Sequence, residues 1–130
     1  MDLKVSQMMK FQQALQDKHP EWGGLYPGRA QDQILWGIAE IGEAVQLIKK
    51  LGPERVKNDP QIRREFIEEM GDVFMYYWDA LMCLGVTAEE FSEIYTAKCE
   101  KNLGRDYVQE HIDKYGDDDG SRKFWGIDEK

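Results

Sequence analysis

Apolar side chains recur at helical spacing along most of the chain, and no stretch alternates apolar and polar residues for long enough to indicate a strand. The first predicted helix covers Asp2–Lys18 and should end at His19-Pro20, because a proline disfavours helical backbone in the residue before it. A loop rich in glycine, Glu21–Arg29, follows it. The apolar positions of this helix are Val5, Met8, Phe11 and Leu15. The pattern predicts an all-α fold.

Three longer helices follow, and each has a recognisable start or stop signal. Gly52-Pro53 ends the first of them, and Asp59 before a proline is typical of the start of the next. Thr87 with Glu90 forms a capping-box pattern at the start of the last. The predicted helices are Ala30–Leu51, Pro60–Leu84 and Thr87–Leu103.

Composition narrows the class of protein. A chain of 130 residues with 42% hydrophobic residues has the length and composition of one globular domain. No apolar run is long enough to span a membrane, and no secretory signal opens the chain, so no membrane partner is expected. The only cysteines, Cys83 and Cys99, argue against a disulfide scaffold and favour a cytoplasmic location.

Charge argues against nucleic acid as a partner. The 25 acidic and 17 basic residues give a net charge of −8, whereas binding to phosphate backbones needs a cationic surface. The acids are dense after Asp106, where a short helix and then irregular chain are expected. We therefore assign residues 1–107 to one all-α domain and residues 108–130 to an acidic C-terminal extension.

Carboxylates lie on unusual faces of two predicted helices. The helix Ala30–Leu51 has an apolar stripe of Ile34, Ile38, Ile41, Val45 and Ile48. Glu40 and Glu43 are not opposite this stripe, where solvent would lie, but share a second stripe with Trp36 and Leu47. Carboxylates in line with a tryptophan and a leucine are not expected of an ordinary solvated surface.

The helix Pro60–Leu84 repeats this arrangement. It has a broad apolar face of Phe66, Met70, Val73, Phe74, Tyr77 and Leu81. A second stripe carries Glu65, Glu69, Asp72, Tyr76, Asp79 and Cys83. Clustered carboxylates repel one another unless a cation joins them, and an all-oxygen set suits a hard cation such as Mg²⁺ or Mn²⁺. Each pair alone is a weak signal in so acidic a chain, but their joint occurrence on adjacent helices is more specific.

The helix Thr87–Leu103 supplies cations. Lys98, Asn102 and Arg105 continue the stripe that begins with its aromatic residues, at a spacing that suits contact with phosphate oxygens. The alternative is that these side chains only extend into solvent at the end of the helix, where cations suit the helix dipole.

These motifs together resemble those of the all-α nucleoside triphosphate pyrophosphohydrolase superfamily, which includes the MazG proteins, the dimeric dUTPases, the dCTPases and phosphoribosyl-ATP pyrophosphatase. The motifs are Glu40-Ile-Gly-Glu43, Glu68-Glu69-Met-Gly-Asp72 and Lys98-x-x-Lys101-Asn102-x-x-Arg105. The resemblance covers Phe11 to Tyr107. Many members have a further glutamate before the first motif, where this chain has Ala39.

The resemblance implies a four-helix bundle of the MazG type with a Mg²⁺ site. The implied metal ligands are Glu40, Glu43, Glu69 and Asp72, and the implied phosphate-binding residues are Lys98, Lys101, Asn102 and Arg105. The implied reaction cleaves a nucleoside triphosphate between the α and β phosphates, with Glu43 or Glu69 as the base. Trp36 and Trp22 are candidates to stack on the nucleobase, and ordinary core or interface packing is the alternative explanation for each of them.

The resemblance also implies nucleotide-pool housekeeping and assembly as a homodimer or tetramer, without identifying the base among dUTP, dCTP or non-standard nucleotides. Three aromatic side chains that the core of one chain would not need, Phe74, Tyr77 and Trp78, are candidates for the interface between subunits.

Two other interpretations of the sequence remain. A ferritin-like di-iron bundle needs Glu-x-x-His motifs, which His19 and His111 do not form. The second interpretation is a catalytically inactive helical module of the same fold that serves in oligomerisation or nucleotide binding.

Overall fold

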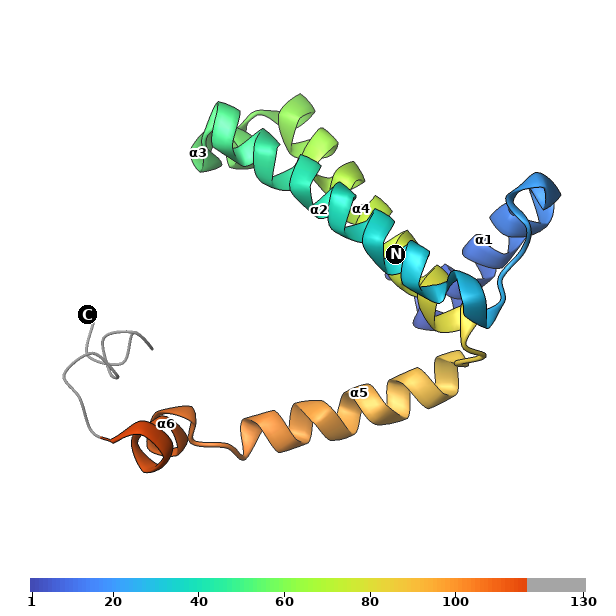
Figure 1. The fold of residues 1–130 in the computed structure, drawn as a ribbon. Helices are drawn as coiled ribbons and strands as arrows, with labels where there is room; N and C mark the ends of the chain where they lie inside the picture. Colours follow the sequence, from blue (N-terminus) through green and yellow to red (C-terminus); the bar gives the residue numbers. More distant parts are fainter. Residues whose placement is uncertain (117–130) are drawn as a thin grey trace. The chain divides into compact units, whose positions relative to one another are not determined.

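The computed structural model describes residues 1–116, and within that range all regular structure is helical, without a strand (Figure 1). This confirms the predicted all-α class for the described part of the chain. The helices are α1 (Val5–Lys18), α2 (Ala30–Leu51), α3 (Pro53–Asn58), α4 (Pro60–Cys83), α5 (Ala88–Leu103) and α6 (Tyr107–Tyr115), with 3₁₀ turns η1 (Pro20–Trp22) and η2 (Pro27–Arg29). Most of the predicted acidic extension, from Asp117 onward, lies outside the described residues. None of the described helices is long and apolar enough to cross a membrane.

Local signals determine where most helices begin and end. The Asp59 carboxylate accepts hydrogen bonds from the backbone N–H groups of Gln61 (3.1 Å) and Ile62 (3.4 Å), which caps α4 as predicted. The Thr87 hydroxyl likewise accepts from the Glu90 N–H at 3.1 Å at the start of α5. The bounds of α2 agree with the prediction. The start of α1 was predicted too early, because it begins at Val5 rather than Asp2.

The connection between α2 and α4 contains a helix that the sequence pattern did not predict. Gly52 has a φ of 84°, a backbone conformation that glycine adopts easily, and this turns the chain out of α2. Pro53 then occupies the first helical position, where its missing N–H costs nothing. Val56 is buried, so one apolar residue anchors this short helix where it packs on α2 and α4.

The chain forms two compact units, Met1–Ser92 and Glu93–Lys130, and the boundary falls within α5. The predicted domain 1–107 therefore includes all of the first unit and the beginning of the second. In the first unit, α2 and α4 run side by side in opposite directions, with α1 packed on α4 (Figure 1). In the second unit, Asp106 caps α6 by accepting a hydrogen bond from the Gln109 N–H at 2.9 Å.

A buried glycine sets the close approach of α2 to α4. A Cβ atom added to Gly37 would lie 3.3 Å from the Cβ of Tyr76, so a larger side chain there would push the helices apart. In an antiparallel pair, one turn forward on α2 matches one turn backward on α4. The contact of Gly37 with Tyr76 therefore places Glu40 near Asp72 and, one turn further, Glu43 near Glu69.

Two of the apolar positions of α1, Phe11 and Leu15, are 62% and 38% exposed. The structure buries Met9, Gln12 and Gln16 of this helix. The side-chain amides of the two glutamines donate hydrogen bonds to α4, a contact that the spacing of apolar residues does not predict.

Much of the apolar surface of α2 and α4 is also exposed in the single chain. Phe74 and Tyr77 are exposed, as expected for residues left over from the core. Trp78 is not: it is buried and packs its ring edge-on against Phe91, with centroids 5.2 Å apart. Trp78 is therefore removed from the predicted interface. Ile34, Leu35, Ile38 and Val45 of α2 and Ile67 and Met75 of α4 add to the exposed apolar set.

Candidate metal and nucleotide site

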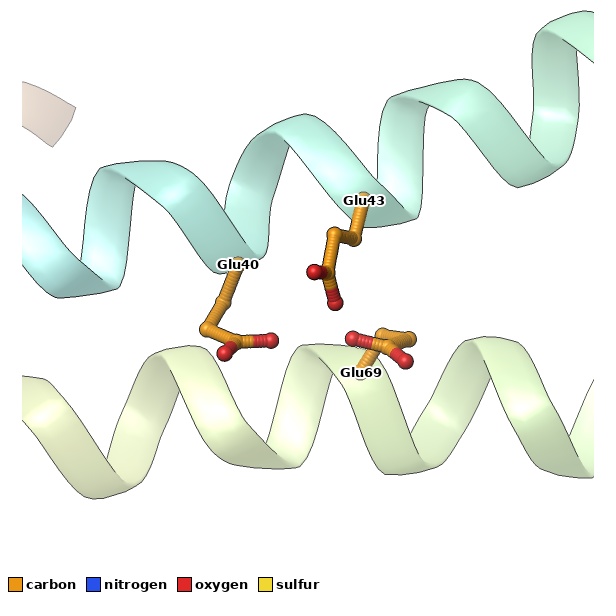
Figure 2. Close-up of side chains that lie close together, drawn as sticks. All are labelled: Glu40, Glu43 and Glu69. Atoms are coloured by element: carbon orange, nitrogen blue, oxygen red, sulfur yellow. The ribbon is translucent and has the colours of Figure 1, made fainter.

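Three glutamates from two helices come together in the first unit (Figure 2). Glu40 and Glu43 extend from α2 toward α4, and Glu69 extends from α4 into the space between them. Each offers a carboxylate oxygen, and these oxygens all lie within 4.8 Å of one another. The structure thus brings together three of the four residues that the resemblance implies as metal ligands.

Asp72 lies beside this cluster without belonging to it. Its carboxylate is not among the oxygens that share the 4.8 Å neighbourhood. Its charge nevertheless acts on Glu40 and contributes to the raised pKa of that carboxyl. Asp72 and Glu40 also line the same cavity. Asp72 is therefore positioned at the edge of the cluster, toward the cavity.

No lysine, arginine or histidine within residues 1–116 forms an ion pair with these three glutamates. The ion pairs found there join other groups, His19 with Glu21, Arg64 with Glu68 and Arg105 with Glu110. One carboxylate oxygen of Glu69, Oε2, is buried and has no hydrogen-bond partner. A buried acceptor without a partner is costly and indicates that a donor or a cation belongs at this point.

The electrostatics of the cluster favour one shared proton when no cation is present. Burial, followed by the hydrogen bonds that a protonated Glu69 makes with Glu40 and Glu43, raises the pKa of Glu69 to about 7. Burial also raises the pKa of Glu40, and the hydrogen bond with Glu69 opposes that rise. We assign the proton to Glu69, which then donates to the Glu40 carboxylate. Up to about pH 7 the cluster therefore holds one proton that an ordinary surface glutamate would have lost.

A cavity of about 650 Å³ adjoins the cluster on the side of Glu40 and Asp72. Both tryptophans singled out from the sequence, Trp22 and Trp36, line it. Trp36 contacts Tyr76 edge-on with ring centroids 6.2 Å apart, and Trp22 stacks on the His19 ring at 4.2 Å. A cavity of this volume with flat aromatic walls has the size of a nucleotide site.

A second cavity, of about 600 Å³, adjoins the other side of the cluster and is lined by Glu43 and Glu69. Lys50 lines it as well, together with the acidic side chains of Glu65 and Glu68. The three glutamates therefore stand between an aromatic cavity and a charged one. A ligand with an apolar part and a charged part would meet both environments across the cluster.

The predicted phosphate-binding residues lie in the second unit. Lys98 and Lys101 are exposed, and Asn102 has a buried side-chain oxygen without a partner. Arg105 is engaged within this unit: its guanidinium donates to both carboxylate oxygens of Glu110, at 2.9 and 3.1 Å, and lies 4.4 Å from the centre of the Tyr107 ring. Glu110 consequently raises the pKa of Arg105.

Four buried polar residues at the aromatic cavity were not predicted as site residues. They are Gln12, Gln16, Gln33 and Asp79, and all of them line the cavity beside Glu40. Two features of the sequence could have suggested these residues. Gln12 and Gln16 are one helical turn apart, and Asp79 lies on the acidic stripe of α4. Neither feature predicts that the glutamines of α1 face α4.

The arrangement offers acidic oxygens for a hard cation, a group that can exchange a proton near neutral pH, and an aromatic cavity beside them. Comparison of this chain with protein-family models, with curated proteins and with solved structures finds no match.

Proposed function

We propose that this protein is a Mg²⁺-dependent nucleoside triphosphate pyrophosphohydrolase of the MazG type, which releases a nucleoside monophosphate and pyrophosphate. The observation that supports the proposal is the group of three glutamate oxygens within 4.8 Å, contributed by two helices and without an ion pair in the described residues. The aromatic cavity beside it supports a nucleotide rather than a simple phosphate as the substrate.

The residues of the cluster fit Mg²⁺. The donors are all carboxylate oxygens, which Mg²⁺ and Mn²⁺ prefer, and the unpartnered Oε2 of Glu69 is an acceptor ready for a cation. Glu40, Glu43 and Glu69 would hold the ion, with Asp72 at the edge of the cluster. Bound there, Mg²⁺ would polarise the α-phosphoryl group and lower the pKa of a water molecule.

The chain's own residues would bind the substrate and move the proton. Glu43 and Glu69 are the candidate bases that would take the proton of the attacking water molecule. Trp22 and Trp36 would provide the aromatic walls for the base. The role of Lys98, Lys101, Asn102 and Arg105 in binding phosphate stays a prediction, and within the second unit Arg105 is paired with Glu110.

The test is to incubate the full chain with a panel of natural, deaminated and oxidised nucleoside triphosphates and Mg²⁺. Pyrophosphate and the monophosphate should appear in equal amounts from at least one substrate, and EDTA should stop their release. Orthophosphate released from the γ position would contradict cleavage between the α and β phosphates. If no triphosphate is cleaved and Mg²⁺ does not bind, the inactive helical module is the better description.

We also propose that the protein is a homodimer or a tetramer. Exposed apolar side chains on α2 and α4, such as Ile38 (55% exposed) and Phe74 (50% exposed), support burial against a second copy. Light scattering at micromolar concentration should give at least twice the chain mass of 15.2 kDa. Ile38→Glu should shift the mass toward the monomer, whereas Gln61→Glu, at an exposed position of α4, should not. A monomer mass for the unmodified chain would contradict the proposal.

A further inference from the structure

The cavity on the Glu43 and Glu69 side of the cluster differs from the aromatic cavity in its charge, and we call it the charged cavity. Its volume is about 600 Å³, and α2 and α4 line it with carboxylates, an amide and a few small or apolar side chains. Among the described residues that line it, Lys50 is the one with a positive charge. The partner of this cation decides what the charged cavity can hold.

Lys50 is not paired with the acids around it. The ion pairs found within residues 1–116 do not include Lys50, although three glutamates of α4 line the same cavity. One of these, Glu68, pairs with Arg64 instead, at 2.9 Å. Glu65 and Glu68 are exposed, so salt screens much of their repulsion of an anion. Lys50 is exposed as well, and its charge is therefore available to an anion that enters the charged cavity.

Helix geometry directs Lys50 toward the glutamate cluster. Glu43 and Lys50 are seven residues apart in α2, which places them on the same side of the helix and about 10 Å apart along its axis. Side chains of a helix lean toward its N-terminus, so the long stem of Lys50 leans toward Glu43 and shortens this separation. Lys49 is turned about 100° away and lines neither of the two cavities. A phosphate group beside the cluster is therefore within reach of Lys50 and not of Lys49.

The aromatic cavity has a cation of its own, Arg29, but this cation is far from the cluster. Arg29 precedes α2 and lies eleven residues before Glu40, which corresponds to about 16 Å along the helix axis. Its guanidinium donates to the Gly24 carbonyl, and its charge acts on Asp79. Phosphates that extend from the cluster would therefore meet a nearer cation in the charged cavity than in the aromatic cavity.

We propose that the charged cavity binds the pyrophosphate leaving group and that Lys50 contacts it. The substrate would lie across the glutamates, with its base in the aromatic cavity and its β and γ phosphates toward Lys50. This inference rests on the proposed function and assigns a direction to the substrate. When water attacks the α-phosphorus, the bond to the bridging oxygen breaks and its electron pair leaves with the pyrophosphate, while the proton of the water passes to the base. Lys50 would stabilise the charge that develops on the leaving oxygen.

The first experiment measures the binding of inorganic pyrophosphate to the full chain, by titration calorimetry in the presence of Mg²⁺. Lys50→Gln should weaken this binding by about tenfold, because it removes a charge-assisted contact. Lys49→Gln makes the same change of charge at an adjacent exposed position outside both cavities, and it should leave the affinity within about twofold. Unchanged affinity in Lys50→Gln, or an equal loss in both variants, would overturn the proposal.

Two further titrations distinguish contact with pyrophosphate from a structural role of Lys50. Lys50→Arg keeps the positive charge and should retain most of the affinity for pyrophosphate that Lys50→Gln loses. Mg²⁺ alone should bind Lys50→Gln at least as tightly as the unmodified chain, because removing one cation near the acids favours the binding of another. Weaker Mg²⁺ binding in Lys50→Gln would indicate that the lysine supports the glutamate cluster, and it would contradict the assignment to pyrophosphate.

Product inhibition tests the direction of the substrate and separates this inference from the proposed function. With a triphosphate that is cleaved, Lys50→Gln should raise the inhibition constant of pyrophosphate about tenfold and leave that of the nucleoside monophosphate within about twofold. An equal rise for both products would overturn the assigned direction. Cleavage with product inhibition that does not depend on Lys50 would leave the hydrolase proposal standing and overturn this inference. Pyrophosphate binding that depends on Lys50, without cleavage of any triphosphate, would uphold the pyrophosphate site and contradict the proposed reaction.

Discussion

Replacing Glu69 by glutamine is expected to lower the turnover of nucleoside triphosphates by about 100-fold or more. The Glu69 carboxylate is the α4 member of the glutamate cluster, and its Oε2 is the buried acceptor without a partner. Glutamine keeps the volume but removes the negative charge and replaces one acceptor with a donor. The variant would therefore bind Mg²⁺ more weakly and lose a candidate base. Steady-state release of pyrophosphate at saturating substrate measures the loss.

An exposed glutamate away from the cluster provides a matched control. Glu54 lies at an exposed position of α3 and lines neither of the two cavities beside the cluster. Glu54→Gln should leave turnover within about twofold, since most substitutions on an exposed surface have small effects. Near-normal turnover in Glu69→Gln, or an equal loss in both variants, would remove Glu69 from the proposed active site.

The stability of the metal-free protein is expected to fall as the pH rises from about 4.5 to about 7. The folded state raises the pKa of Glu69 from 4.5 to about 7, so between these values the folded chain binds more protons than the unfolded chain. Stability then decreases with pH, because losing a proton costs the folded state more than the unfolded state. Thermal unfolding in EDTA across this pH range measures the slope.

The same substitution separates a metal site from a structural cluster. At neutral pH, Glu69→Gln should raise the metal-free melting temperature by a few degrees and flatten its dependence on pH, because the repulsion within the cluster is reduced. Mg²⁺ should raise the melting temperature of the unmodified chain in a saturable way and that of the variant much less. If the variant is instead less stable at neutral pH and the response to Mg²⁺ is unchanged, the glutamates support the fold and do not bind the metal.

Local sequence determined the helix ends and the spacing of the acids. The cap formed by Asp59, the stop at Gly52 and the bounds of α2 depend on residues within a few positions of one another, so they could be predicted from the sequence. The spacing of Glu40 and Glu43 puts them on the same side of one helix by geometry alone. That they meet Glu69 depends on the antiparallel pairing of α2 with α4, which Gly37 permits by its lack of a side chain.

Only the tertiary structure decided which faces are buried. Phe11 is one of the apolar positions at helical spacing in α1, yet the structure exposes Phe11 and buries Gln12 and Gln16. The reason is that Asp79, on a different helix and far along the chain, accepts hydrogen bonds from both amides, and no local pattern records such a pairing. The sequence by itself therefore determined the helices and their acidic stripes. The packing of α1 and α2 on α4 created the cavity beside those stripes and left two buried polar atoms within it unpaired.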